Sequence, residues 1–586
     1  MSGNAAKADP ITVEIVRNGV LSVTEEMKTN LMRTAYNMII YEALDFTVGL
    51  FTATGETVSI GLGLPMFIRG MSETVKAKLA KIGPENMQPG DILITNDSYT
   101  TGSHLNHVTL SLPIFHEGKL IAFTCCMAHW LDIGGSIGQV TTDIYSEGLQ
   151  IPIMKLQRAG VLNEDLVDLI KMNVRLPDTA WGDLRAQITA VTSGERAFRS
   201  IVNRYGCDDV LNSIAAIMDQ TEAEARANTR TIPDGVYEAE SFMDDDGLDI
   251  GTHIPIKVKV TVAGDEMTID LSEVSHQVRG FYNSGITTGF ACAQVAYKCL
   301  TTGTTYPVND GSFRSLNVIM PPGRVISATR PAPMRWWMTF PMTVIDTIFK
   351  ALAPAIPDRV IAGHHADLVT TTLHGINPLD GRFFIAAVGP LGGGWGAKST
   401  EDGVGVTVCI NDGDTHNSPS EQIETKYPIL VEKYELRQDS GGAGRHRGGL
   451  GAECVVQALA PIAFNSTIER VHCKPWGLDG GLAGDGNLID VRVNGEWRGK
   501  LPNAKMFTER IRPGDAFMVR SGGGGGFGAP VERPADQVVF DVVEGYVSAE
   551  SAERDYGVIL DASGKKLDVG ATQARRQTLV KSKAAE

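Results

Sequence analysis

The first part of the chain alternates between helical and strand-like spacing of its apolar residues. Residues 11–36 place apolar side chains three and four positions apart, and Asp9 and Pro10 before them supply a cap and a first-turn proline, which predicts a helix. Residues 45–59 alternate apolar and polar positions around a Thr-Gly pair, which is typical of a β-hairpin. Residues 71–83 return to helical spacing and end on a glycine, where a helix cap forms most easily. Helices and a paired sheet are therefore expected together.

The pattern changes twice further along the chain. Helical spacing dominates from Val161 to about Thr229, strand-like runs follow, and short strands with glycine turns dominate beyond residue 405. A chain of 586 residues is too long for one hydrophobic core, because cores stop growing at roughly 250 to 300 residues. We therefore expect a multidomain α+β protein. Its predicted parts are a helical and mixed domain at 1–228, a mixed α/β domain at 229–404 and a strand- and glycine-rich domain at 405–586.

Charge and cysteine content exclude several kinds of partner and site. A formal net charge of -16 without a local run of Lys or Arg repels phosphate backbones and anionic membrane surfaces, so neither nucleic acid nor a membrane is expected as a partner. The N-terminus lacks an apolar signal region, and no run reaches the ~18 apolar residues of a membrane span. We therefore expect a soluble, cytoplasmic protein. The eight cysteines form no CxxC pair, so reduced thiols are expected and a cysteine-ligated zinc is not.

Two glycine-rich runs differ from phosphate-binding loops. Residues 521–530 lack the Lys-Ser/Thr pair of a P-loop. Residues 391–399 contain Lys398 and Ser399, but no helical pattern follows them. ATP, if it is used, is therefore expected on another subunit.

Two further polar blocks each allow a structural and a functional interpretation. Residues 439–451 set Arg445, His446 and Arg447 among glycines, which would suit phosphate or carboxylate capture. We favour a glycine-rich structural turn at a domain or subunit contact. The acidic run 244–246 lacks the twelve-position pattern of a calcium loop, so a solvated hairpin turn is expected there.

The histidines are unevenly distributed. Four of the twelve lie close together, and His104 and His107 are only three residues apart, so both can converge on one ion. A strand-like run ends at His129 after a turn next to His116. Two short strands joined by that turn would bring His129 back beside His104 and leave His116 at the far, solvated end.

Carboxylates lie in or near the same segments. Asp45 opens an earlier strand, and Asp97 and Asp132 flank the histidines. Divalent ions at catalytic centres favour imidazole and carboxylate ligands with one open position, so a metal site is one interpretation. Ordinary polar loop residues are the other, and spacing alone leaves both open. Asn96 and Asp97 are better suited to shaping the loop through bonds from side chain to backbone.

Three tryptophans are candidates for the wall of an apolar substrate pocket. They are Trp130, which follows His129, and the adjacent pair Trp336 and Trp337. Tryptophans are highly buried on average, so packing in the core is the favoured interpretation for the pair.

Longer blocks of sequence carry a resemblance to a known family. The blocks are DPITVEIVRNGV, NDSYTTGSHLNHVTL, AHWLDIGG, EGLQIP, GDLRAQ, DSGGAGRHRGGLG, SGGGGGFG and DYGVIL, and they span nearly the whole chain. In these blocks the chain resembles the hydantoinase B/oxoprolinase family. That family includes N-methylhydantoinase and lactamase subunits and subunits of acetone and acetophenone carboxylases.

The resemblance implies a site for one divalent metal at Asp45, His104, His107 and His129. Relatives usually read Gly-Thr-His-Leu-x-Asp where this chain has Gly-Ser-His-Leu-Asn-His, so His107 stands at an aspartate ligand position. An imidazole can still ligate, and the loss of negative charge shifts the preference toward softer ions. Zinc is therefore favoured, with manganese or iron next, and a changed or lost site is the alternative. Asp132 is the candidate catalytic residue, as a general base or as a group that orients a ligating histidine.

The same resemblance implies a two-component, ATP-dependent enzyme that acts on a small-molecule carbonyl. A partner subunit of the hydantoinase A type would bind Mg-ATP and phosphorylate the carbonyl oxygen, and the activated species would react near the metal. The assembly would be a hetero-oligomer, (αβ)2 or larger. Opening of a cyclic amide, such as a hydantoin, oxoproline or lactam, is the first hypothesis. The alternatives are ATP-dependent carboxylation of a ketone and a non-catalytic scaffold subunit.

Overall fold

The computed structural model of the protein describes residues 9–301, 308–413, 415–499 and 501–585. The chain folds into two compact units. Unit 1 comprises Met1–Glu238, Lys257–Ile345 and Asn411–His416, and unit 2 comprises Ala239–Ile256, Asp346–Ile410 and Asn417–Glu586. Each unit is therefore built from several separate stretches of chain. The division into three parts expected from composition stays a prediction.

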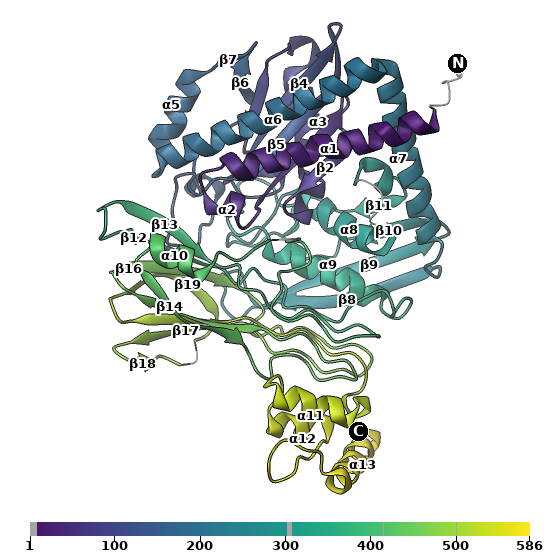
Figure 1. The fold of residues 1–586 in the computed structure, drawn as a ribbon, viewed down its shortest axis with the longest axis vertical. Coiled ribbons are helices and arrows are strands. Elements are labelled where there is room, and N and C mark those ends of the chain that lie inside the picture. The colour runs from purple at the N-terminus through teal and green to yellow at the C-terminus, as the bar shows by residue number, and fades with distance from the viewer. Residues whose placement is uncertain (1–8, 302–307, 414, 500, 586) are drawn as a thin grey trace. The chain divides into compact units, whose positions relative to one another are not determined.

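A seven-stranded antiparallel sheet forms the centre of unit 1, with strand order β2-β1-β5-β4-β3-β6-β7. The strands are β1 (Phe46–Thr52), β2 (Thr57–Leu62), β3 (Ile92–Thr95), β4 (His107–His116), β5 (Lys119–His129), β6 (Met154–Arg158) and β7 (Val161–Leu162). The long helices α1 (Pro10–Thr34) and α6 (Pro177–Tyr205) lie side by side against this sheet (Figure 1). Together they cover its apolar side chains, and the hairpin expected at residues 45–59 is confirmed as β1 and β2.

Helix α1 shows how the sequence determines this layer. The Asp9 carboxylate accepts a hydrogen bond from Thr12 N at 2.9 Å, and Pro10 occupies the first turn, so the predicted cap is confirmed. Val16 and Val20 are 0% exposed and lie four residues apart on the same face of the helix. Burying each such side chain stabilises the fold by roughly 1.5–3 kcal/mol relative to leaving it exposed.

Further helices and a second sheet complete unit 1. The helices are α2 (Met38–Tyr41), α3 (Gly70–Ile82), α4 (Ser98–Thr101), α5 (Glu164–Asn173), α7 (Cys207–Thr229) and α8 (Ile286–Thr301), with short 3-10 turns η1 (Pro65–Ile68), η2 (Pro84–Asn86), η3 (Ile144–Ser146) and η4 (Asp310–Phe313). The second sheet has the order β11-β10-β9-β8, with β8 (Gly235–Met243), β9 (Ile254–Ala263), β10 (Glu266–Asp270) and β11 (Leu316–Ile319). The chain passes between the two units within β8, β9 and helix α9 (Thr339–Leu352). The helical stretch predicted up to about residue 229 and the strands after it are confirmed.

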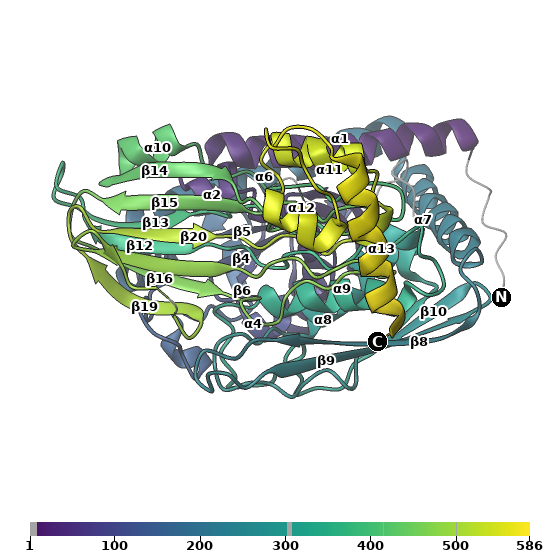
Figure 2. The same ribbon diagram turned by 90° about the horizontal axis from the view of Figure 1, so that it is seen from below.

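Unit 2 contains two antiparallel sheets, with strand orders β13-β12-β16-β19 and β14-β15-β20-β17-β18. The strands are β12 (Thr371–Ile376), β13 (Phe383–Val388), β14 (Ile429–Leu436), β15 (Ala452–Ala458), β16 (Ile462–Ile468), β17 (Leu488–Val493), β18 (Glu496–Trp497), β19 (Ala504–Ile511) and β20 (Ala516–Arg520). The remaining elements are α10 (Ser420–Lys426), η5 (Pro530–Glu532), α11 (Ala535–Val543), α12 (Ala549–Tyr556) and α13 (Val569–Ala585). Figure 2 shows β14, β15 and β20 side by side. The α+β class is confirmed. The last fifty or so residues lie in the part of the chain that was predicted to be rich in strands and glycine, but they form the helices α11, α12 and α13.

The glycine-rich runs of unit 2 pair with one another through their backbones. Gly442 N donates to Gly524 O at 2.8 Å, and Gly524 N donates to Gly449 O at 2.9 Å. A Cβ atom added at Gly448 would lie 1.9 Å from Gly524 O, so only glycine permits this approach. The block 439–451 therefore has the structural role that we favoured, while its location at a domain or subunit contact stays a prediction.

The acidic run 244–246 is buried, so the expected solvated turn is wrong. Asp244 is 1% exposed, and its carboxylate accepts three backbone N–H bonds from residues 471–473 at 2.7 to 3.0 Å. Asp245 accepts a bond from Lys505 Nζ at 3.0 Å. Buried carboxylates are tolerated because their hydrogen bonds replace water, and no local pattern in the sequence reveals those distant partners.

Two expectations about the chain as a whole concern its cysteines and its hydropathy. All eight cysteines are free of disulfide bonds, and five of them are buried, where they pack as small apolar groups. The described helices include none that is both long and apolar enough to cross a membrane.

Candidate metal centre

The hairpin of β4 and β5 brings two of the predicted histidines together. His107 begins β4 and His129 ends β5, and the antiparallel register places them directly opposite each other. His116 lies at the other end of the hairpin, opposite Lys119. Residues opposite each other in such a pair have Cβ atoms about 4.5–5.5 Å apart, so the register alone makes the two imidazoles neighbours.

His104 joins them from the turn that precedes β4. Helix α4 ends at Gly102, which has a φ of 89°, and a Cβ atom there would lie 2.6 Å from Thr288 Oγ1, so the sharp turn requires glycine. The ring centroid of His104 lies 4.4 Å from that of His107 and 4.8 Å from that of His129. Three imidazoles from two segments thus form one cluster.

Asp45 completes the set of residues that the family resemblance implied. Asp45 Oδ1 lies 2.9 Å from His107 Nε2, and the Asp45 carbonyl accepts a bond from His129 N at 3.0 Å. Asp45 precedes β1, His107 begins β4 and His129 ends β5, so antiparallel pairing puts all three at the same end of the sheet. The four residues lie together, and their role as metal ligands stays a prediction.

One nitrogen of each ring is buried and has no hydrogen-bond partner among the described residues. These atoms are His104 Nε2, His107 Nδ1 and His129 Nδ1. Leaving a buried polar atom unpaired costs roughly 1–3 kcal/mol. Native folds rarely leave such atoms unpaired, and one bound ion would satisfy all three atoms of this cluster together.

The segment around Met334 and Arg335 orients His104. His104 Nδ1 lies 3.0 Å from the Arg335 carbonyl, which assigns the proton to Nδ1 and leaves the lone pair on Nε2. Glu147, which is 2% exposed, accepts N–H bonds from Met334 and Arg335 at 3.0 to 3.1 Å and a hydroxyl bond from Thr141 at 2.6 Å. Glu147 is therefore a positioning residue that acts on His104 through the backbone.

Burial sets the protonation of the cluster. Burial, aided by His107 and His129, holds the pKa of His104 well below its ordinary value. Burial likewise lowers the pKa of His129 to about 4, although Asp45 opposes this shift. Burial alone would raise the pKa of Asp45, but the neighbouring His107 and His129 outweigh it and keep that pKa below its usual range. At pH 7 the site therefore offers an ionised carboxylate beside the neutral imidazoles of His104 and His129.

Aromatic side chains cover one side of the cluster. The Phe67 ring lies 4.8 Å from that of His107, and Trp337 lies 5.7 Å from His107 and 6.2 Å from His104. Both Phe67 and Trp337 are almost fully buried. Trp130 is also buried and donates its indole N–H to Gln187 at 2.9 Å, so it belongs to the core and does not line a pocket.

Asp132 is held by a different set of partners. Its carboxylate accepts bonds from Arg175 Nη1 at 2.7 Å, from Gly134 N at 3.1 Å and from the backbone N–H of Arg175. The hydrogen-bond partners described for Asp132 do not include a histidine. In this structure Asp132 therefore secures the segment that follows His129, and a role in proton transfer stays a prediction.

Asn96 and Asp97 shape the loop before α4, as the sequence indicated. Asn96 Nδ2 donates to Leu105 O at 2.8 Å, and Asn96 Oδ1 accepts from Ile151 N at 2.6 Å. Asp97 caps α4 through Tyr99 N at 3.3 Å. The interpretation of both residues as loop-shaping groups is confirmed.

A second group of metal-ligating side chains lies in unit 2. Asp244, His253 and Cys473 have ligand atoms that all lie within 4.8 Å of one another. The histidine cluster of unit 1 is less tightly gathered than this group. Its chemistry nevertheless fits a divalent metal better, because three imidazole nitrogens that have no partner among the described residues lie there beside the Asp45 carboxylate.

Sequence reasoning missed the groups that surround the histidines. Glu147 lies in the block EGLQIP, but nothing in that block shows that it holds residues 334 and 335. Phe67 and the Arg335 carbonyl likewise reach the cluster only through the tertiary fold. The signal that the sequence did offer concerned the histidines themselves: they are few in the whole chain, and four of them lie close together.

Known proteins are similar to this chain over nearly its whole length. The model of the hydantoinase B/oxoprolinase family matches residues 9–530. The caprolactamase beta chain of Pseudomonas jessenii is 31% identical over 584 residues, which cover 97% of this chain and 99% of that protein. A protein of Pseudomonas sp. (strain NS671) described as the B component of a D-/L-hydantoinase is also 31% identical, over 97% of this chain and 98% of that protein.

Solved structures share the same fold. The crystal structure of the ATP-dependent caprolactamase from Pseudomonas jessenii has a TM-score of 0.90 at 29% identity and covers 97% of this chain and 99% of that chain. A nucleotide-free acetone carboxylase has a TM-score of 0.89 at 20% identity, over 99% of this chain and 84% of that chain, a likeness of fold alone. The family model and the relatives above 30% identity lead to one conclusion: this chain belongs to the hydantoinase B/oxoprolinase family.

Proposed function

We propose that this chain is the metal-binding, catalytic subunit of an ATP-dependent, two-component enzyme that opens a cyclic amide. The observation that supports this most is the convergence of Asp45, His104, His107 and His129, where three ring nitrogens find no partner in the part of the chain that the structure describes. The relative named as a caprolactamase beta chain, whose structure is described as ATP-dependent, supports the reaction class. The substrate is then a hydantoin, an oxoproline or another lactam.

The second component is a subunit of the hydantoinase A type that binds Mg-ATP. The glycine runs of this chain are engaged in packing against each other, which supports placing nucleotide binding on a partner. Phosphorylation of the amide oxygen by that partner converts an unreactive carbonyl into one with a good leaving group. The assembly is a hetero-oligomer, (αβ)2 or larger.

The four clustered residues would hold one divalent metal, with zinc favoured and manganese or iron next, and the metal would supply Lewis acidity at the carbonyl or at water. His104 is fixed for this role by the Arg335 carbonyl. The lowered pKa of His129 keeps its lone pair free of a proton at neutral pH. An imidazole at position 107 leaves one carboxylate in the set, which favours the softer ions.

The remaining side chains around the site keep it ordered and dry. Phe67 and Trp337 exclude water from the side of the cluster that they cover, which strengthens electrostatic interactions there. Asp132 acts by fixing the segment after His129 through its bonds to Arg175 and Gly134. A role for Asp132 as general base requires that it release Arg175.

The test is elemental analysis of the chain purified with its A-type partner, beside the same complex carrying His104→Ala and His129→Ala. We expect about one equivalent of metal that disappears in the double variant. ATP-dependent opening of caprolactam, hydantoin or 5-oxoproline should fall about a thousandfold, equivalent to about 4 kcal/mol of transition-state stabilisation. His116→Ala, at the far end of the same hairpin, should change neither quantity.

The alternatives predict different outcomes of the same experiment. A carboxylated product that forms only with bicarbonate would establish a ketone carboxylase in place of the lactamase. Absence of metal from the unmutated complex, with activity unaffected by the double variant, would leave a scaffold subunit.

A further inference from the structure

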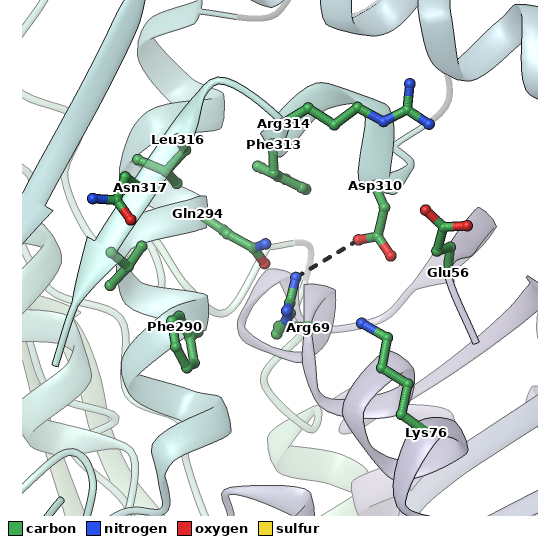
Figure 3. A pocket seen from close by; sticks show the side chains of 11 residues that line it. Glu56, Arg69, Lys76, Phe290, Gln294, Asp310, Phe313, Arg314, Leu316 and Asn317 are labelled. Atoms are coloured by element: carbon green, nitrogen blue, oxygen red, sulfur yellow. Dashed lines mark ion pairs between the residues drawn. The ribbon is translucent and has the colours of Figure 1, made fainter. Parts of the chain in front are cut away.

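A pocket of about 340 Å³ lies in unit 1, and its lining includes none of the four clustered residues. Arg69 and helix α3 form one wall, and α8, η4 and β11 form the other (Figure 3). Pockets that bind small molecules measure roughly 300 to 1,000 Å³. This one is near the lower limit and suits a ligand of few atoms.

Both signs of charge line this pocket. Arg69, Lys76 and Arg314 provide cations, and Asp310 and Glu56 provide carboxylates (Figure 3). The side chains come from separate elements of the fold and converge on one space. A ligand that enters it therefore meets both donors and acceptors.

Each of these cations is paired with a carboxylate outside the lining. Arg69 pairs with Glu73 at 2.7 Å, and Lys76 pairs with the same carboxylate at 3.1 Å. Arg314 pairs with Asp219 at 2.8 Å. Arg314 also pairs with Glu222 at 3.2 Å. Carboxylates therefore outnumber the cations around the pocket, so a ligand that carries an ammonium as well as a carboxylate fits better than a phosphate or sulfate ion.

The contact between Arg69 and Asp310 is long. Arg69 Nη1 lies 3.9 Å from Asp310 Oδ1, beyond the 2.7–3.2 Å of an N–H···O hydrogen bond. Asp310 is held in place by Thr57 N, which donates to its other oxygen at 2.9 Å. Arg69 Nε is buried without a hydrogen-bond partner among the described residues. The pair therefore keeps an acceptor and a donor available to a ligand.

An amide and two rings complete the lining. Gln294 is 4% exposed, and its Oε1 has no hydrogen-bond partner among the described residues. Figure 3 shows its amide directed toward the space beside Arg69. Phe290 and Phe313 give the pocket an apolar surface, which suits a short carbon chain.

We propose that this pocket binds a small zwitterionic amino acid. Its carboxylate would meet Arg69, its ammonium would meet Asp310 and Gln294 Oε1, and its carbon chain would lie against Phe290. The pKa of Asp310 is raised by burial despite Arg69, and an ammonium ligand would stabilise the ionised carboxylate. Which amino acid binds rests on the lactam form of the proposed function, because addition of water across the C–N bond of a lactam leaves an amine and a carboxylate on one molecule.

The pocket is joined to the histidine cluster by one short segment. Phe67 in η1 packs against His107 at 4.8 Å, and Arg69 follows two residues later. Helix α8, which carries Gln294, also contacts η1. The amino acid site is therefore a neighbour of the cluster that uses none of its four residues.

The test is calorimetric titration of the full chain with glycine, 4-aminobutyrate and 6-aminohexanoate. Hexanoate and hexylammonium, which each carry one of the two charges, and inorganic phosphate are titrated in parallel. We expect saturable binding of at least one zwitterion, about tenfold or more tighter than either single-charge analogue. No saturation up to ~10 mM, or equal binding of hexanoate or phosphate, overturns the proposal.

Variants locate the site. Arg69→Gln and the near-isosteric Gln294→Met should each weaken binding about tenfold or more. Arg199→Gln is the matched control, because it removes an equivalent helical ion pair, with Glu195, outside the pocket. Unchanged affinity in both pocket variants, with folding verified by circular dichroism, contradicts the assignment.

A last variant separates this proposal from the proposed function. His104→Ala with His129→Ala should leave amino acid binding intact. Loss of binding in that variant would move the ligand to the histidine cluster and overturn the pocket. Binding that persists in a complex without lactam-opening activity would refute the proposed function and leave the pocket established.

Discussion

Two clusters of buried polar side chains, one in each unit, are partnered in different ways. In unit 1, His104, His107 and His129 each leave one buried ring nitrogen without a partner among the described residues. In unit 2, Lys505 Nζ, about 1% exposed, donates to the Asp245 carbonyl and carboxylate at 3.1 and 3.0 Å and also to Glu469. The histidine cluster can therefore accept a ligand. In the network around Lys505 the ammonium is already paired with buried carboxylates, as a structural network requires.

This difference shows why proximity alone is a weak guide to a metal site. Asp244, His253 and Cys473 are gathered more tightly than the histidines of unit 1. The Asp244 carboxylate, however, is occupied by three backbone N–H groups, and His253 Nδ1 lies 3.0 Å from the Asp244 carbonyl. Ring nitrogens without a described partner, rather than short distances, distinguish the candidate metal centre from this group.

Lys505→Met should have the largest effect, on the buried charges of unit 2. Removing this ammonium leaves Glu469 and Asp245 buried without their cation, which should lower the free energy of unfolding of unit 2 by about 3–5 kcal/mol. Urea unfolding followed by circular dichroism measures the loss. Lys474→Met is the control, because Lys474 is half exposed beside Asp485 and such pairs contribute at most about 1 kcal/mol. Equal effects of the two variants would show that the network around Lys505 is not structural.

The stability of unit 2 should depend on pH through Asp367. Burial raises the pKa of Asp367 to about 7, while its carboxylate accepts bonds from Val369 N at 2.6 Å and Glu469 N at 3.0 Å. Between about pH 4 and pH 7 the folded state keeps a proton that the unfolded chain releases. The contribution of Asp367 to stability should therefore fall as the pH rises through this window, by a few kcal/mol at most.

Asp367→Asn should flatten that part of the stability profile. The comparison is between unfolding midpoints of the unmutated chain and the variant at pH 4.5 and pH 7.5. Asp178→Asn, at an exposed position in α6, should leave the profile unchanged. A profile of the Asp367 variant that remains parallel to that of the unmutated chain would show that another group titrates.

The smallest effect is expected from a change at Glu147, which acts on His104 through the backbone of residues 334 and 335. Glu147→Gln removes one acceptor oxygen from the segment that fixes His104, so metal affinity should fall about tenfold, at the lower end of the range for groups outside the ligand set. Competition with a chelator measures it. Glu164→Gln, exposed in the first turn of α5, should leave the affinity unchanged. A hundredfold or greater loss would place Glu147 closer to the chemistry than the structure does.

The local elements could be predicted from the sequence because their causes are local. The cap at Asp9, the spacing of the valines in α1 and the alternation of β1 and β2 all act between residues a few positions apart. The same holds for the hairpin that returns His129 to His107. The family resemblance then implied Asp45 as the fourth member of the cluster.

Only the tertiary structure decided which polar groups are satisfied and which are left unpaired. Nothing local distinguishes Asp244, buried under distant N–H groups, from an acidic turn in solvent, and composition predicted the turn. The same is true of Glu147, whose partners lie 187 and 188 residues away. Hydrogen-bond satisfaction depends on contacts between segments far apart in the chain, which periodicity does not encode, whereas the residue types available for chemistry are written in the sequence itself.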